Sequence, residues 1–213
     1  MNKKIHIFDF DGTLVDSMPC WSEKMLNILR KTNTPYPDGL IKYIATLGDK
    51  GTAKYFLEEL GVPLSIDEMF AMMDEYALPR YRDEIMLKDG VWGYLKKLSD
   101  EGCSLNVLTA SPHKVLDPCL RRLGIFNLFD NVWSSDDFGR SKVDLQIYLD
   151  AAKKLDCTVS DAAFYDDNVG AIKTASSAGM YTVGIYDASA EDYTAEIKSI
   201  ADIYVVSMDE LIR

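Results

Sequence analysis

The sequence is poor in cysteine, histidine and positive charge, and each shortage excludes a class of protein. Four cysteines and two histidines occur in 213 residues, and Cys20, Cys103, Cys119 and Cys157 form no CxxC pair and no zinc-site spacing. A chain of this length needs no disulfides, so reduced thiols, as in the cytoplasm, are the simplest interpretation. Lys and Arg number 23 against 34 Asp and Glu, a net charge of −11. That charge argues against general binding to nucleic acid or to anionic membrane surfaces.

Long hydrophobic runs are also missing. The first apolar run, Ile5 to Phe8, meets Asp9 and Asp11 at once, so it is too short and too acidic for a signal peptide. No apolar stretch approaches the roughly 20 residues of a transmembrane helix. With 47% hydrophobic and 27% charged residues, the composition is that of a globular protein of one or two domains. We expect a cytoplasmic monomer or weak homodimer.

The hydrophobic pattern predicts strands that alternate with helices. Strands are expected at 5–8, 103–108, 131–134, 162–165, 181–185 and 203–206. Such alternation is typical of an α/β fold, a doubly wound parallel sheet with helices on both faces.

One block of the chain interrupts that alternation. Residues 17–88 contain only helical patterns, the third of them disturbed by Pro79, and we interpret the block as an inserted helical cap. The catalytic core would then comprise 1–16 and 89–213, with hinges near Ser17 and Lys88.

Polar side chains follow several of the predicted strands, where ligands bind in open parallel sheets. They are Asp9, Asp11, Thr109, Ser111, Lys142, Asp166 and Asp167. Lys142 is expected at the start of the helix after the third strand. Ser111 and Pro112 are expected to cap and begin the helix before it.

So many carboxylates in one crevice need a counter-charge. Two of them about 5 Å apart repel by roughly 3 kcal/mol at an effective dielectric near 20. An all-oxygen set without His or Cys suits a hard divalent ion, and Mg²⁺ is the expected cofactor. Lys142 and the Thr109 hydroxyl would then face an anionic group opposite the metal, and phosphate fits both.

Four segments together resemble the motifs of the haloacid dehalogenase superfamily of phosphohydrolases. Residues 8–17 (FDFDGTLVDS) resemble the first motif and residues 108–111 the second. Lys142, followed by Ile147 and Tyr148, resembles the third motif, and residues 166–168, leading to Ala178-Gly179-Met180, resemble the fourth. All four occur in order over nearly the whole chain, and a helical insert directly after the first motif resembles the subfamily with a C1 cap.

The resemblance implies a role for each matching residue. Asp9 would be the nucleophile that forms an aspartyl-phosphate. Asp11 would protonate the leaving oxygen and then activate the attacking water. Asp9, the Asp11 backbone carbonyl and Asp167 would hold Mg²⁺, assisted by Asp166.

The resemblance also implies how a phosphoryl group is bound. Thr109, the Ala110 amide and Lys142 would hold its oxygens. Two motifs depart from the usual pattern. Val143, Asp144 and Leu145 stand where prolines commonly follow the lysine, and Asp166 and Asn168 stand where Glu and Ser are frequent.

The function expected from the resemblance is Mg²⁺-dependent hydrolysis of a small phosphorylated metabolite. A sugar-phosphate mutase is an alternative, although Trp21 stands near the place where such mutases often carry a His. A non-catalytic phospholigand-binding protein is a second alternative, and Asp9 and Asp11 speak against it. Lys50 lies between predicted cap helices and is a candidate contact to the substrate's distal polar group.

Overall fold

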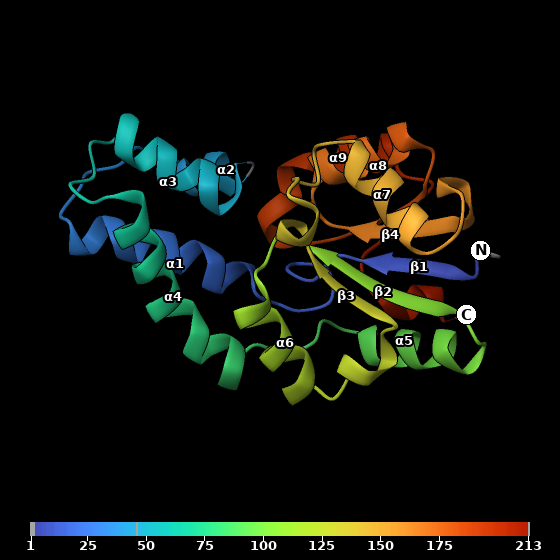
Figure 1. The fold of residues 1–213 in the computed structure, drawn as a ribbon. Coiled ribbons are helices and arrows are strands. Elements are labelled where there is room, and N and C mark those ends of the chain that lie inside the picture. The colour runs from blue at the N-terminus through green and yellow to red at the C-terminus, as the bar shows by residue number, and fades with distance from the viewer. Residues whose placement is uncertain (1–2, 46, 213) are drawn as a thin grey trace.

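The computed structural model describes residues 3–45 and 47–212, and its centre is a parallel six-stranded sheet (Figure 1). The strand order is β3-β2-β1-β4-β5-β6. The strands are β1 (Ile5–Phe8), β2 (Ser104–Thr109), β3 (Asn131–Ser134), β4 (Ala162–Asp166), β5 (Tyr181–Ile185) and β6 (Ile203–Val205). Every neighbouring pair is parallel, which confirms the predicted α/β class.

Helices cover both faces of the sheet. One face is covered by α5 (Val91–Asp100) and α6 (His113–Arg122), and the other by α7 (Gln146–Lys154), α8 (Val169–Ala178) and α9 (Thr194–Ile200). Strand alternation supplies an apolar cluster to each face, because Phe8 packs on the α5 and α6 side while Ile7 packs on the side of α7 and α8. The sheet is therefore buried on both faces, as expected of parallel strands.

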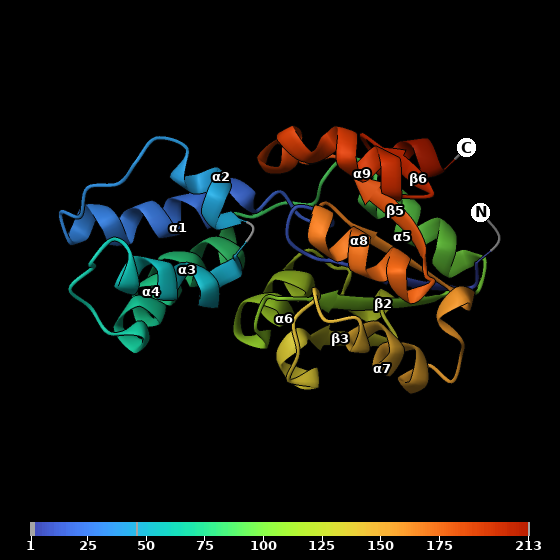
Figure 2. The same cartoon turned by 90° about the horizontal axis from the view of Figure 1, so that it is seen from above.

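A second group of helices follows β1 and lies beside the sheet (Figure 2). It consists of α1 (Met18–Lys31), α2 (Leu40–Ala45), α3 (Gly48–Glu58) and α4 (Ile66–Asp83), which we call the helical insertion. Met25, Ile28, Phe56 and Met69 are fully buried in its own apolar cluster. The four helices thus form a core separate from the two clusters on the sheet.

Pro79 does not disturb α4 in the way its sequence suggests. The helix begins with a capping box between Ser65 and Glu68 and continues through Pro79 to Asp83. A proline within a helix forfeits its own N–H hydrogen bond. Here Ala77 and Tyr81, on either side of it, are buried against the sheet's apolar cluster, so tertiary packing holds the last turn in place.

The two chain segments that connect the insertion to the sheet run side by side. Val15 and Leu87 form an antiparallel bridge. The Asp16 amide donates to the Met86 carbonyl at 3.0 Å. The predicted hinges at Ser17 and Lys88 lie directly beside this paired crossing.

The sequence predicts neither disulfides nor a transmembrane helix, and the structure bears on both expectations. All four cysteines are free, and Cys20 and Cys119 are buried. Among the helices of residues 3–45 and 47–212, none is both long enough and apolar enough to cross a bilayer.

Candidate active site

Three buried carboxylates meet where β1 and β4 end. These neighbouring strands pair Phe8 with Tyr165, and the Asp9 amide donates to the Tyr165 carbonyl at 2.9 Å. The next residues along the two strands are therefore adjacent in space. One carboxylate oxygen each from Asp9, Asp166 and Asp167 lies within 4.8 Å of the other two.

Lys142 is inserted among these carboxylates. Its Nζ lies 2.5 Å from Asp9 Oδ1 and 2.7 Å from Asp166 Oδ2, and only 12% of the side chain is exposed. The expectation that Lys142 begins a helix is wrong, because α7 starts four residues later at Gln146. The Tyr148 hydroxyl, from α7, donates to the Lys142 carbonyl at 2.8 Å and fixes the turn that carries the lysine.

The electrostatics of the cluster follow from burial and mutual repulsion. Burial raises the pKa of Asp9 to about 7; Lys142 counteracts this, while Asp166 adds to it. Burial, with the charges of Asp166 and Asp9, raises the pKa of Asp167 well above its ordinary value. Burial disfavours the charged form of Lys142, but Asp166 and Asp9 outweigh it and raise the pKa of the lysine.

The donor set fits a divalent cation. All three side chains offer oxygen, the ligand that Mg²⁺ prefers, and none offers nitrogen or sulfur. When all three carboxylates are ionised, Lys142 balances one of the negative charges, and two remain for a cation to neutralise.

Gly12 lets the loop after β1 approach this cluster. Its φ is +76°, and a Cβ there would lie 2.6 Å from Asp167 Oδ2. A larger residue would therefore suffer both backbone strain and a clash. The adjacent Thr13 hydroxyl donates to Asp167 Oδ1 at 3.1 Å, so the loop also orients that carboxylate.

The Asp11 carboxylate is surrounded by hydroxyl groups. Its Oδ1 accepts from Ser17 Oγ at 2.7 Å and from the Tyr81 hydroxyl at 2.5 Å, and its Oδ2 accepts from Ser111 Oγ at 2.5 Å. Tyr81 comes from α4, so the helical insertion contributes directly to the surroundings of Asp11. The part expected of Asp11 in metal binding is its backbone carbonyl, and that stays a prediction.

Ser111 does not cap α6 as expected. The helix begins at His113, and Pro112 occupies the N-cap position with an extended backbone. The Ser111 hydroxyl donates to Asp11 Oδ2 and accepts no backbone N–H from the described residues of α6, and a hydrogen bond to a charged carboxylate is stronger than a neutral capping bond.

Thr109 and Ala110 lie at the same edge of the sheet. β2 pairs beside β1 with Val107 opposite Phe8, which places Thr109, the last residue of β2, near the level of Asp9. Thr109 is buried and its hydroxyl accepts from the Ser111 amide at 3.1 Å, whereas Ala110 is exposed.

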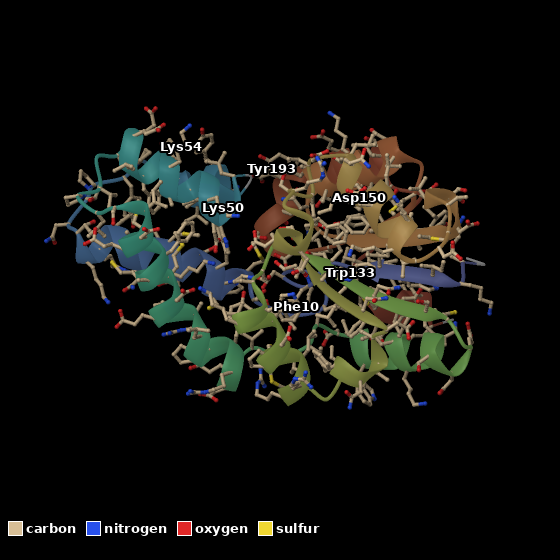
Figure 3. The ribbon with its side chains drawn as sticks, in the orientation of Figure 1. Phe10, Lys50, Lys54, Trp133, Asp150 and Tyr193 are labelled. Atoms are coloured by element: carbon tan, nitrogen blue, oxygen red, sulfur yellow. The ribbon has the colours of Figure 1, made fainter. Side chains whose placement is uncertain are left out.

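Two residues of the insertion singled out in the sequence have charged partners. The Trp21 indole donates to Asp49 Oδ1 at 2.8 Å, and Lys24 holds the other oxygen of Asp49 at 2.7 Å. Lys50 is 81% exposed and lies 2.9 Å from Asp136, which follows β3 (Figure 3). Lys50 therefore links the insertion to the sheet, and its contact with substrate stays a prediction.

Comparison with known proteins gives consistent matches. Residues 3–179 match the family model described as haloacid dehalogenase-like hydrolase. The chain is 27% identical over 209 residues to validoxylamine A 7'-phosphate phosphatase of Streptomyces hygroscopicus subsp. limoneus, covering 98% of this chain and 95% of that protein. It is 27% identical to phosphoglycolate phosphatase of Psychrobacter arcticus, covering 87% and 84%. The crystal structure of CbbY from Rhodobacter sphaeroides in complex with phosphate superposes with a TM-score of 0.85, at 20% identity and covering 98% and 96%.

Proposed function

The chain belongs to the haloacid dehalogenase-like hydrolase family and is a phosphohydrolase, and we propose that it hydrolyses small phosphomonoesters with Mg²⁺ through an aspartyl-phosphate. The observation that carries the proposal is the meeting of three buried carboxylates with Lys142 at the ends of β1 and β4. The free thiols fit a reducing compartment, and we place the protein in the cytoplasm as a monomer or weak homodimer.

The carboxylate cluster would hold the metal. Asp9, Asp167 and the Asp11 backbone carbonyl supply the ligands in this proposal, and Asp166 assists while it anchors Lys142. When bound, the ion offsets negative charge that develops on the phosphoryl oxygens.

Asp9 acts as the nucleophile. One of its carboxylate oxygens attacks phosphorus, and the bond from phosphorus to the ester oxygen breaks as the new one forms. Thr109, the Ala110 amide and Lys142 hold the phosphoryl oxygens. Lys142 already contacts Asp9 at 2.5 Å, so its ammonium is close enough to stabilise charge at the reacting centre.

Asp11 moves the protons. Its acid form gives a proton to the departing alkoxide in the first half-reaction. Its carboxylate then takes a proton from the water that attacks phosphorus, which frees phosphate and restores Asp9. Ser17, Tyr81 and Ser111 position the carboxylate for both transfers.

Residues 17–88 serve as a cap in this proposal, and residues 1–16 with 89–213 form the catalytic core. Tyr81, from α4, reaches the Asp11 carboxylate, so the insertion completes the site. Movement about the paired crossing at Val15 and Leu87 would admit substrate and exclude water during transfer.

Hydrolysis of phenyl phosphate with and without Mg²⁺ tests the proposal. We expect metal-dependent release of phosphate that falls by at least about a thousandfold in Asp9→Asn, because the neutral amide is a far weaker nucleophile. Circular dichroism of Asp9→Asn checks that the fold is kept. Turnover of Asp9→Asn near the parent rate would remove Asp9 as nucleophile.

A separate incubation distinguishes the mutase alternative. A sugar 1-phosphate should yield free sugar and phosphate in this proposal. Conversion to another phosphate isomer without release of free phosphate would instead support a mutase, which returns the phosphoryl group to a different hydroxyl of the sugar.

A further inference from the structure

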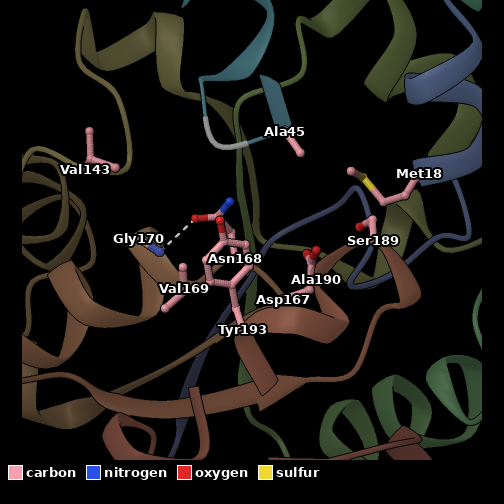
Figure 4. Close-up of a pocket in the computed structure, with 10 residues that line it drawn as sticks. All are labelled: Met18, Ala45, Val143, Asp167, Asn168, Val169, Gly170, Ser189, Ala190 and Tyr193. Atoms are coloured by element: carbon pink, nitrogen blue, oxygen red, sulfur yellow. Dashed lines mark hydrogen bonds between the residues drawn. The ribbon is translucent and has the colours of Figure 1, made fainter. Parts of the chain in front are cut away.

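A cavity of about 120 Å³ opens beside Asp167, between the helical insertion and the sheet (Figure 4). Met18 and Ala45 line it from the insertion, and Val143 and Val169 line it from the sheet side. Tyr193, the last residue of the short helix η4 (Ala188–Tyr193), completes the wall. Asp167 belongs to the carboxylate cluster and also lines the cavity, so the cavity borders the proposed reaction centre.

The cavity offers no positive charge. Among the described residues that line it, Asp167 is charged and none is Lys or Arg. The N-terminus of α8 reaches the cavity, but the Gly170 and Ala171 amides already donate to Asn168 Oδ1 at 2.9 and 3.2 Å. A carboxylate or second phosphate entering here would lose water without gaining an ionic partner, which is costly.

The polar groups of the cavity suit hydroxyl groups instead. Asn168 contributes a side-chain amide, and the Ser189 hydroxyl, which donates to Asp187 Oδ1 at 2.7 Å, keeps lone pairs that accept hydrogen bonds. The apolar walls and the Tyr193 ring can cover the C–H faces of a carbon skeleton. The site therefore combines apolar surface with a few uncharged hydrogen-bonding groups.

We propose that this cavity binds the leaving-group half of the substrate, that this half is an uncharged polyhydroxylated chain or ring, and that Tyr193 determines specificity for it. The inference rests on the proposed phosphatase function and narrows its substrate class. It would separate this chain from phosphatases that act on esters with an anionic leaving group.

The segment that carries Tyr193 is anchored from two sides. Asp187 caps η4 by accepting from the Ser189 amide at 2.9 Å, and it pairs with Lys88 at 2.8 Å. From the insertion, Lys42 on α2 forms an ion pair with Asp192. The buried Asp187–Lys88 pair anchors the start of η4, and the exposed Lys42–Asp192 pair adds only a weak contact with the insertion next to Tyr193.

Lys50 makes the opposite hypothesis testable. Its ammonium is the candidate for binding an anionic distal group, but it does not line the cavity and is paired with Asp136. If Lys50 selected the substrate, esters with a carboxylate would be preferred, and loss of the lysine would remove that preference.

Two matched pairs of substrates separate the hypotheses. Glycerol 3-phosphate and 3-phosphoglycerate differ only by a hydroxymethyl group in place of a carboxylate, and glucitol 6-phosphate and 6-phosphogluconate differ in the same way. We expect kcat/KM to favour the uncharged member by at least about tenfold in one pair or both. Phenyl phosphate, measured in parallel with Mg²⁺, reports on the chemistry alone.

Variants assign the effect to the cavity. Tyr193→Ala should lower kcat/KM for the uncharged ester at least about fivefold, mainly through KM, while Tyr193→Phe, which keeps the ring, stays near the parent. Ala190→Lys, which adds a cation to the lining, should reduce the ratio of kcat/KM for the uncharged ester to that for the carboxylate ester by about tenfold. Lys50→Ala should leave the preference unchanged.

Each contrary result has a defined meaning. A higher kcat/KM for the carboxylate member of both pairs would overturn the inference while the phosphatase function stands. So would a preference between the two esters that disappears in Lys50→Ala. Turnover of phenyl phosphate with none of the four esters hydrolysed would also overturn it. If phenyl phosphate and all four esters resist hydrolysis, the proposed function itself fails.

Discussion

Replacing Lys142 with Met should destabilise the fold, because the buried carboxylates around it would lose their positively charged partner. The ammonium contacts Asp9 at 2.5 Å and Asp166 at 2.7 Å, and the three side chains are 12%, 5% and 0% exposed. At an effective dielectric near 20, opposite charges about 4 Å apart attract by about 4 kcal/mol per pair, much of it offset by desolvation. Removing one partner of a buried pair costs about 3–5 kcal/mol, because the other charges remain buried.

For a chain of this size, each kcal/mol shifts the melting temperature by about 2–4 °C, so Lys142→Met without metal should melt roughly 6–20 °C lower. Mg²⁺ should raise the melting temperature of Lys142→Met more than that of the parent, because the variant site is more negative. Differential scanning calorimetry with EDTA or with Mg²⁺ measures both effects. Lys54→Met, whose side chain is 67% exposed, is the control and should change little. A variant as stable as the parent without metal, or insensitive to Mg²⁺, would refute the reasoning.

Three further perturbations act elsewhere. Burial lowers the pKa of His6 from 6.5 to about 4, so the contribution of its neutral form to stability is complete above pH 6.5 and is lost as the pH falls toward 4. Urea titrations over that range should show the parent losing up to about 3 kcal/mol more of its free energy of unfolding than His6→Gln, and equal losses in the two proteins would contradict this. Lys88→Met should lower the free energy of unfolding by about 3–5 kcal/mol, because Lys88 pairs with Asp187 at 2.8 Å and both are largely buried. Denaturation of Lys88→Met, Asp187→Asn and the double variant should give a coupling energy above about 1 kcal/mol, whereas additive losses of stability would rule out the pair. Tyr81→Phe removes a 2.5 Å donor to Asp11 and should lower kcat about tenfold with KM little changed; steady-state kinetics within twofold of the parent would show that Tyr81 does not position Asp11.

Lys88 also binds the segment that leads from α4 back to the sheet to two neighbouring loops. Its Nζ donates to the Gly12 carbonyl at 2.6 Å and to the Tyr186 carbonyl at 2.6 Å, in addition to Asp187. One ammonium thus joins the loop after β1, the crossing and the loop after β5. The sequence offered only its place near a hinge, since the contacts depend on two loops far along the chain.

The strands and the carboxylate cluster were predictable because they depend on local pattern and on a general property of parallel sheets. Asp9, Asp166 and Asp167 each follow an apolar strand, and parallel strands bring their carboxyl ends to one edge. The surroundings of Asp11 were less accessible. Ser17 lies within the first motif, but Tyr81 stands 70 residues away from Asp11 on a helix whose packing decides its direction.

Predictions failed where tertiary contacts outweigh a local preference. Pro79 is a helix breaker by sequence, yet burial of its neighbours carries α4 to Asp83. Ser111 is a good helix cap by sequence, yet a carboxylate from another loop takes its hydroxyl. The cavity beside Asp167 could not be predicted at all, since its walls come from segments of the insertion and of three separate loops.

The most direct measurement of the central claim is chemical trapping of the phosphorylated enzyme. The protein is mixed with Mg²⁺ and excess phenyl phosphate, quenched in acid within milliseconds and treated with sodium borohydride, which reduces an acyl phosphate to an alcohol. Peptide mass spectrometry then locates the reduced side chain. We expect the reduction at Asp9. In Asp11→Asn the phosphorylated form should appear more slowly, because Asn cannot protonate the leaving oxygen, and then persist longer, because Asn cannot activate the attacking water. Phosphate release with Asp9 unmodified in both proteins, or reduction at another residue, would contradict a nucleophilic role for Asp9.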